Sequence, residues 1–261
     1  MNMPNETLPN LLTFAQELAW QAGRSTLAYF NTGVVPDLKA DQTPVTIADR
    51  EAEQRMRAMI ASRFPGHAIL GEEYGETNAG ASHRWILDPI DGTKSFVQGV
   101  PFYGVLVGLE RDGEPVLGVC YLPALDEMIA AAKGQGCTFN GRQVRVSAVA
   151  RLSDAVVACS DAESFAAYHR DAAFDEVRSN AKFTRTWGDC YGHMLVATGR
   201  AEIMLDPILS VWDCAALLPI VQEAGGSFTS WHGETTIWGE SGISTNAALH
   251  DQIMQIVKRN A

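Results

Sequence analysis

The stretch Trp85-Ile86-Leu87-Asp88-Pro89-Ile90-Asp91-Gly92-Thr93 decides how this chain folds and where its chemistry lies. Its apolar residues predict a short buried strand that ends at Asp88, with a turn at Pro89 and Asp91 at the start of a helix or loop. If both carboxylates were ionised about 4 Å apart, they would repel by about 4 kcal/mol at an effective dielectric constant of about 20. A divalent cation removes this repulsion. Because the donors are the oxygens of Asp88, Asp91 and the Ile90 carbonyl, the pattern favours Mg²⁺, with Mn²⁺ as a substitute.

Other acidic residues decide between this metal site and a simple turn, which Asp, Pro and Gly also form. Glu72 and Glu73 follow a short apolar run, Asp213 begins an apolar helix, and Asp49 lies in the first turn of another helix. Each has a local explanation: a solvated loop for the glutamates, an N-cap for Asp213, and a Thr-x-x-Asp capping box for Asp49. Their occurrence together favours the metal site.

Hydrophobic periodicity divides the chain into residues 1–146 and 147–261, which we expect to be two subdomains. The first part has two amphipathic helices, at 8–30 and from about 46 to before Pro65, followed by short strands with hairpin turns. The pattern predicts an antiparallel sheet with strands at 68–71, 84–87, 102–109, 116–122 and 128–132. The second part alternates, with strands at 156–159, 183–187 and 203–205 and helices at 163–168, 191–197 and 213–223. We therefore predict a mixed α/β (α+β) fold, with ligands at strand ends between the two parts.

Composition excludes several classes of protein. The 261 residues are 46% hydrophobic and 20% charged, which is typical of a globular protein. With 20 basic and 31 acidic residues the formal charge is −11, which argues against nucleic-acid binding. No apolar run approaches the roughly 20 residues of a membrane span. The five cysteines lack CxxC spacing, which predicts reduced core residues in a cytoplasmic protein.

Taken in order, the acidic segments resemble the inositol monophosphatase superfamily of magnesium-dependent phosphomonoesterases. The resemblance rests on Glu72-Glu73, on Asp88-Pro89-Ile90-Asp91-Gly92-Thr93, and on Trp212-Asp213 with Glu223-Ala224-Gly225-Gly226. It extends from about residue 8 to the C-terminus. It implies a layered αβαβα fold, a homodimer, and a small phosphate monoester as substrate.

The resemblance also implies a role for each residue that matches the family pattern. The implied metal ligands are Glu72, Asp88, the Ile90 carbonyl, Asp91 and Asp213. Asp49 and Thr93 are expected to orient the attacking water, with assistance from Glu72, while one metal ion lowers the pKa of water and another stabilises the leaving alkoxide. The residues expected at the substrate are Asp91, Gly92, Thr93, Arg185, Gly188, Asp189, Asp206 and Asp213.

Two of these positions indicate which ester is the substrate. In the inositol-specific branch the position of Asp189 is usually small and apolar and that of Asp206 is usually Glu, whereas Gly188-Asp189-Cys190-Tyr191 is more similar to the histidinol-phosphate phosphatase branch. Histidinol phosphate carries an ammonium group and an imidazole, which these carboxylates complement. Alternatively, Asp189 is the N-cap of a helix that begins near Cys190. Arg185 is placed either to contact phosphate or to pair with a nearby acid.

The leading hypothesis is therefore an Mg²⁺-dependent enzyme that hydrolyses L-histidinol phosphate to L-histidinol and phosphate, in histidine biosynthesis. One alternative is an inositol-1-phosphate or broad sugar-phosphate monophosphatase of the same family. Another is a metal-binding homologue without activity, which the presence of both Asp49 and Thr93 argues against.

Overall fold

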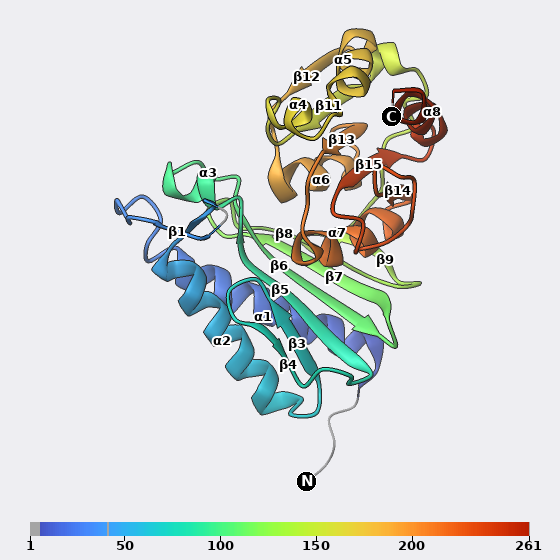
Figure 1. Ribbon diagram of the computed structural model, residues 1–261. Helices are drawn as coiled ribbons and strands as arrows, with labels where there is room; N and C mark the ends of the chain where they lie inside the picture. Colours follow the sequence, from blue (N-terminus) through green and yellow to red (C-terminus); the bar gives the residue numbers. More distant parts are fainter. Residues whose placement is uncertain (1–5, 41, 261) are drawn as a thin grey trace.

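The computed structural model describes residues 6–40 and 42–260, which form alternating layers of helix and sheet (Figure 1). The order of layers is a helix pair, an eight-stranded sheet, a second helix pair, a five-stranded sheet, and an outer set of helices. The predicted αβαβα fold is therefore confirmed. The helix layers are, in this order, α1 (Leu8–Thr26) with α2 (Ile47–Arg63); α6 (Asp189–Ala197) with α7 (Val211–Glu223); and α4 (Ser164–Ala167), α5 (Asp171–Asn180) and α8 (His250–Arg259).

The first sheet has the order β10-β9-β8-β7-β6-β5-β3-β4. Its neighbours are antiparallel as predicted, except for β3 and β5, which are parallel. The exception arises because β4, three exposed residues without a hydrophobic signal, returns the chain along the edge before β5 begins. The strands are β3 (Ala68–Gly71), β4 (Gly75–Thr77), β5 (His83–Asp91), β6 (Gly104–Arg111), β7 (Glu114–Leu122), β8 (Glu127–Ala132), β9 (Gly136–Phe139) and β10 (Arg142–Val144).

Both faces of this sheet are buried, which explains why its central strands are nearly continuous apolar runs. In β5, Trp85 and Leu87 pack in the core formed with α1 and α2. Ile86, between them, points to the other face and packs with residues of α6 and α7. This double burial fixes the strand that carries Asp88 and Asp91.

Two glycines let α7 approach the sheet closely. A Cβ at Gly118 would lie 2.0 Å from the carbonyl oxygen of Ala216, and a Cβ at Gly108 would lie 2.7 Å from the Cβ of Ala215. Neither position tolerates a side chain without displacing the helix. The close contact brings Asp213, in the first turn of α7, toward the end of β5.

The second sheet has the order β12-β11-β13-β15-β14 and mixes parallel with antiparallel pairs. The predicted strand at 156–159 matches β11, and the predicted helix at 213–223 begins two residues earlier. The prediction stopped at Gly225-Gly226 and omitted β14, β15 and α8, and it also omitted α5. The strands are β11 (Val156–Cys159), β12 (Phe183–Arg185), β13 (Ile203–Asp206), β14 (Gly226–Thr229) and β15 (Gly242–Asn246).

The segment between α1 and α2 has more structure than the sequence predicted. α1 ends at Thr26 rather than near residue 30, and the following loop contains a small antiparallel pair, β1 (Asp37–Leu38) and β2 (Pro44–Val45). Residue 41 of this loop lies outside the described residues. The five cysteines are buried and unpaired. Among the helices described, none is both long and apolar enough to cross a membrane.

Candidate active site

Three aspartates from two elements converge between the sheet and the second helix layer. One carboxylate oxygen each from Asp88, Asp91 and Asp213 lies within 4.8 Å of the other two. The first two come from the end of β5, where the ladder with β6 is irregular between Asp88 and Asp91, and the third comes from α7. The strand continues to Asp91, so the predicted strand end at Asp88 and turn at Pro89 are wrong, and so is the alternative that this segment is only a turn. The convergence of these acids was the central prediction from the sequence.

The electrostatics of this trio suit a hard cation. Burial, followed by repulsion from Glu72, Asp91 and Asp213, raises the pKa of Asp88 well above its ordinary value. Burial also raises the pKa of Asp213 to about 7, and burial and Asp189 raise that of Asp91. The carboxylates thus repel one another when ionised. A donor set made only of oxygen atoms with surplus negative charge fits a divalent cation such as Mg²⁺.

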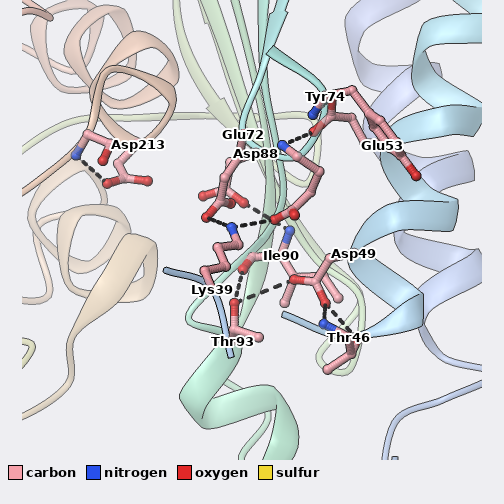
Figure 2. Close-up of polar contacts among 12 residues, drawn as sticks. Lys39, Thr46, Asp49, Glu53, Glu72, Tyr74, Asp88, Ile90, Thr93 and Asp213 are labelled. Atoms are coloured by element: carbon pink, nitrogen blue, oxygen red, sulfur yellow. Dashed lines mark hydrogen bonds and ion pairs between the residues drawn. The ribbon is translucent and has the colours of Figure 1, made fainter. Parts of the chain in front are cut away.

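Asp49 lies in the capping box that the sequence predicted at the start of α2. Its Oδ2 accepts hydrogen bonds from the backbone N–H (2.8 Å) and the hydroxyl (2.6 Å) of Thr46. Its Oδ1 faces Thr93, whose single hydroxyl proton can be donated to Asp49 Oδ1 (3.5 Å) or to the Ile90 carbonyl (3.0 Å) (Figure 2). The local and the functional interpretations of Asp49 are therefore compatible, because each uses a different oxygen.

Asp213 also belongs to a capping box, but it is not the N-cap. Ser210 is the N-cap of α7, and its backbone N–H donates to Asp213 Oδ2 over 2.7 Å. The prediction that Asp213 is the N-cap is therefore wrong, because the N-cap lies three residues earlier. As in α2, the acid at the third helical position uses one oxygen for the cap.

Glu72 lies beside the aspartate trio and is paired with a lysine. Lys39, from the loop after β1, donates to Glu72 Oε1 over 2.7 Å and to Glu73 Oε1 over 2.6 Å (Figure 2). Burial alone would lower the pKa of Lys39, but these two hydrogen bonds raise it above its ordinary value. Burial raises the pKa of Glu72 despite the lysine, with a contribution from Glu73. The two glutamates are thus not the solvated loop of the alternative explanation.

Glu53 of α2 fastens the strand end that carries these glutamates. Its side chain is fully buried, and its carboxylate accepts from the backbone N–H groups of Glu73 (2.7 Å) and Tyr74 (3.2 Å). A Cβ at Gly71 would lie 2.1 Å from Glu53 Oε1, so only glycine fits there. Figure 2 shows Glu53 beside Tyr74, at the upper right of the acidic cluster. Glu53 therefore fixes where Glu72 lies.

Asp189 places a further carboxylate next to the start of α3 (Thr93–Val97). A Cβ at Gly92 would lie 2.9 Å from Asp189 Oδ2, and the Ser95 hydroxyl donates to the same oxygen over 3.4 Å. The N-cap of α6 is Gly188, so the alternative role of Asp189 as N-cap is wrong. The backbone of Asp189 is left-handed, with φ 54°, a conformation that costs about 1–2 kcal/mol for a non-glycine residue. Burial raises the pKa of its carboxyl to about 6.

The remaining predicted substrate residues lie in different surroundings. Asp206, at the end of β13, is only 1% exposed, and its carboxylate accepts from His193 and from the backbone N–H of Ser160. Arg185 is exposed, donates to the carbonyl of Thr184, and lies over the ring of Phe183. These two contacts account for the position of Arg185. They involve neither a phosphate nor an acid, the two partners that the sequence suggested.

A second group of metal-ligating side chains lies at the opposite end of β5. Atoms of Glu6, His67 and His83 lie within 4.8 Å of one another. However, Trp85 Nε1 donates to His67 Nδ1 (3.1 Å), and Arg111 Nε donates to His83 Nε2 (3.0 Å). A neutral imidazole has one acceptor nitrogen, and in both rings it is already occupied. This group is therefore a hydrogen-bonded stack and not a second metal centre.

Comparisons with known proteins agree with this geometry. The model of the inositol monophosphatase family matches residues 8–261. The chain belongs to this family. A histidinol-phosphatase from Chlorobaculum parvum is 47% identical over 240 residues, covering 91% of this chain and 93% of the relative. A histidinol-phosphatase from Mycobacterium tuberculosis is 40% identical over 223 residues, covering 84% and 86%. The crystal structure of the extragenic suppressor protein suhB from Bartonella henselae matches with a TM-score of 0.88 and 30% identity, covering 97% of this chain and 100% of that one.

Membership of the inositol monophosphatase family confirms the predicted resemblance and the predicted class, a phosphoric monoester hydrolase. The sequence prediction nevertheless missed Lys39 and Glu53. Glu53 had a detectable signal, because it lies four residues after Asp49 on the inner face of a helix, where an acid is unusual. Lys39 had no periodic signal, since its place depends on how the loop folds back.

Proposed function

We propose that this inositol monophosphatase family member is a Mg²⁺-dependent phosphatase that hydrolyses L-histidinol phosphate to L-histidinol and phosphate. The observation that carries the proposal is the carboxylate of Asp189 beside Gly92, at the edge of the aspartate trio. A cationic leaving group gains from a fixed negative charge there, whereas a neutral polyol gains less. The names of the two histidinol-phosphatases that cover most of the chain support the same substrate.

Mg²⁺ would be held by Asp88, Asp91 and Asp213, with the Ile90 carbonyl and Glu72 as further ligands, shared between two ions. These residues come from both of the proposed subdomains, 1–146 and 147–261. When bound, divalent cations supply charge neutralisation for the phosphate ester and a lower pKa for water. Lys39 engages only Oε1 of Glu72, which leaves Oε2 as the oxygen that would reach the metal.

Asp49 and Thr93 would orient the attacking water. The Thr93 hydroxyl donates to Asp49 or to the Ile90 carbonyl, which leaves its oxygen lone pairs free to accept a hydrogen bond from water. Burial raises the pKa of Asp49 even though Thr46 donates to it, which makes this carboxylate a better proton acceptor. The capping box holds Asp49 through Oδ2, which would leave Oδ1 to accept the hydrogen bond from water.

Recognition of the ester would be divided between its two ends. Near Gly92 and Thr93 the chain begins α3, where the first backbone N–H groups have no carbonyl partner within the helix and suit phosphate oxygens. Asp189 would pair with the ammonium group of the leaving alcohol. With a pKa of about 6, its carboxyl is ionised at neutral pH, as this contact requires.

A panel of esters tests the proposal with purified protein and Mg²⁺. We expect histidinol phosphate to be hydrolysed with a higher kcat/KM than myo-inositol 1-phosphate or p-nitrophenyl phosphate. Asp189→Asn should lower kcat/KM for histidinol phosphate by about 10- to 100-fold, since it removes one charge-assisted hydrogen bond, and should change p-nitrophenyl phosphate hydrolysis little. Much faster turnover of myo-inositol 1-phosphate would overturn the substrate, and no phosphate release from any ester would overturn the enzyme.

A further inference from the structure

Buried polar side chains form a hydrogen-bonded chain between α6 and the second sheet. His193 Nε2 contacts Asp206 Oδ2 at 3.1 Å, and His193 Nδ1 contacts Ser244 Oγ at 2.7 Å. The side chains of His193 and Ser244 are fully buried, and Asp206 is 1% exposed. Because a carboxylate only accepts, His193 Nε2 donates to Asp206, and Nδ1 shares a second hydrogen bond with the Ser244 hydroxyl.

The chain continues from Asp206 to the backbone of Asp189. Asp206 Oδ1 accepts from the backbone N–H of Ser160 (3.3 Å), and Ser160 Oγ accepts from the backbone N–H of Asp189 (2.7 Å). Ser160 also packs tightly on Gly188, the residue before Asp189. A Cβ at Gly188 would lie 2.1 Å from Ser160 Cα. Ser160 therefore supports both residues that begin α6.

Asp206 and Asp189 differ in what their carboxylates contact. Both oxygens of Asp206 are engaged by His193 and Ser160, inside the protein. Asp189 is half-buried, and its Oδ2 lies beside Gly92. Its left-handed backbone is one that an L-residue keeps only when the surroundings enforce it. The hydrogen bond from its N–H to Ser160 is one such restraint.

We infer that His193, Asp206 and Ser160 are positioning residues for substrate selection: they hold the backbone turn that aims the Asp189 carboxylate at Gly92, and Asp206 itself does not contact the substrate. This inference rests on the proposed function of Asp189. It assigns to Asp206 a role different from the direct substrate contact expected from the sequence. It also assigns a role to His193, which no motif singled out.

Two substitutions of His193 distinguish a positioning role from a general effect on protein stability. His193→Gln keeps an amide N–H near the position of Nε2 and hence the bond to Asp206, whereas His193→Asn keeps only the group near Nδ1. We expect His193→Asn and Ser160→Ala each to lower the ratio of kcat/KM for histidinol phosphate to that for p-nitrophenyl phosphate by about 10-fold. His193→Gln should stay within about 3-fold of the unmodified enzyme. Ser147→Ala, which removes a half-buried hydroxyl that accepts from Asn246 outside this hydrogen-bonded chain, is the control.

A double-mutant cycle supplies the decisive kinetic readout. In an Asp189→Asn background, Ser160→Ala should have almost no further effect on the ratio, because the group that it positions is already gone. Equal effects of Ser160→Ala in both backgrounds, or equal losses in His193→Asn and His193→Gln, would contradict the inference.

Crystal structures keep the test independent of the substrate. In Ser160→Ala and His193→Asn we expect Asp189 to leave the left-handed region and its carboxylate to leave Gly92. An unchanged Asp189 in both structures overturns the inference, whatever ester the enzyme prefers. If the unmodified enzyme fails to hydrolyse histidinol phosphate while Asp189 moves as expected, the proposed function fails and the positioning role stands.

Discussion

The helices α2 and α7 begin in the same way, yet their acidic residues serve different purposes. In each, a hydroxyl residue is the N-cap, and the acid three positions later accepts from the N-cap backbone N–H, over 2.8 Å in α2 and 2.7 Å in α7. The other oxygen of Asp49 faces the hydroxyl of Thr93. Asp213 instead faces the carboxylates of Asp88 and Asp91.

The difference teaches that one local motif acquires its chemistry from what the fold places opposite it. An acid opposite a hydroxyl can orient water and accept a proton, whereas the charge of an acid opposite two other acids is stabilised by a cation. Because both acids keep a capping bond, asparagine at either position retains the cap acceptor. Asp→Asn substitutions therefore test the two roles with little change to the helix ends.

The largest expected effect is that of Asp213→Asn on metal-dependent activity. Removing a carboxylate from the trio should lower kcat/KM by roughly 1,000-fold, because charge neutralisation by the metal is worth several kcal/mol. The Mg²⁺ concentration for half-maximal activity should rise as well. Titration of activity with Mg²⁺ measures both. Asp251→Asn, at an acid in the first turn of α8, is the control and should change neither.

Asp49→Asn should act on the chemical step without weakening the metal site. We expect kcat to fall by about 100-fold, as for loss of a proton acceptor, with the half-saturating Mg²⁺ concentration unchanged. Thr93→Val, which removes the hydroxyl but keeps the side-chain shape, should behave similarly. A large rise in the Mg²⁺ requirement of either variant would erase the distinction between the two helix starts.

The pH dependence of stability should distinguish the metal-free protein from the metal-bound protein. Folding raises the pKa of Asp213 from about 3.9 to about 7, so protonated Asp213 favours the folded protein. That contribution to stability is lost as the pH rises toward about 7. We expect the Tm in EDTA to fall between about pH 4 and about pH 7, and to fall less with saturating Mg²⁺. Thermal melts across this range provide the measurement. Equal slopes with and without Mg²⁺ would show that the trio does not bind the ion.

The smallest effect concerns the metal-free protein above about pH 7. There, Asp213→Asn should raise the free energy of unfolding by about 1 kcal/mol, because it removes one charge from a repulsive group. Asp49→Asn should raise it by less, because burial raises the pKa of Asp49 but the hydrogen bonds from Thr46 partly offset the cost of its charge. Urea denaturation in EDTA measures both. A larger gain for Asp49→Asn than for Asp213→Asn would contradict the proposed difference in surroundings.

Much of the fold was predictable because its strongest signals are local. The strand 68–71 and the capping box at Asp49 matched the structure, since burial and hydrogen bonding there follow from neighbouring residues. The short exposed strand β4 was missed, because its three exposed residues carry no periodic signal. The supports of the site were missed for another reason: Lys39, Glu53 and Ser160 act across sequence separations that no local pattern encodes.

The amino-acid sequence by itself indicated which carboxylates could share one site, because acids at the ends of apolar strands and in the first turns of helices can be recognised from local patterns. Only the tertiary structure decided which acids face solvent-accessible space and which face a protein partner. Asp189 and Asp206 are alike in sequence terms, but one points toward Gly92 and the other is enclosed by His193 and Ser160. The physical reason is that a side chain's neighbours are set by the packing of whole layers, which is a property of the entire chain.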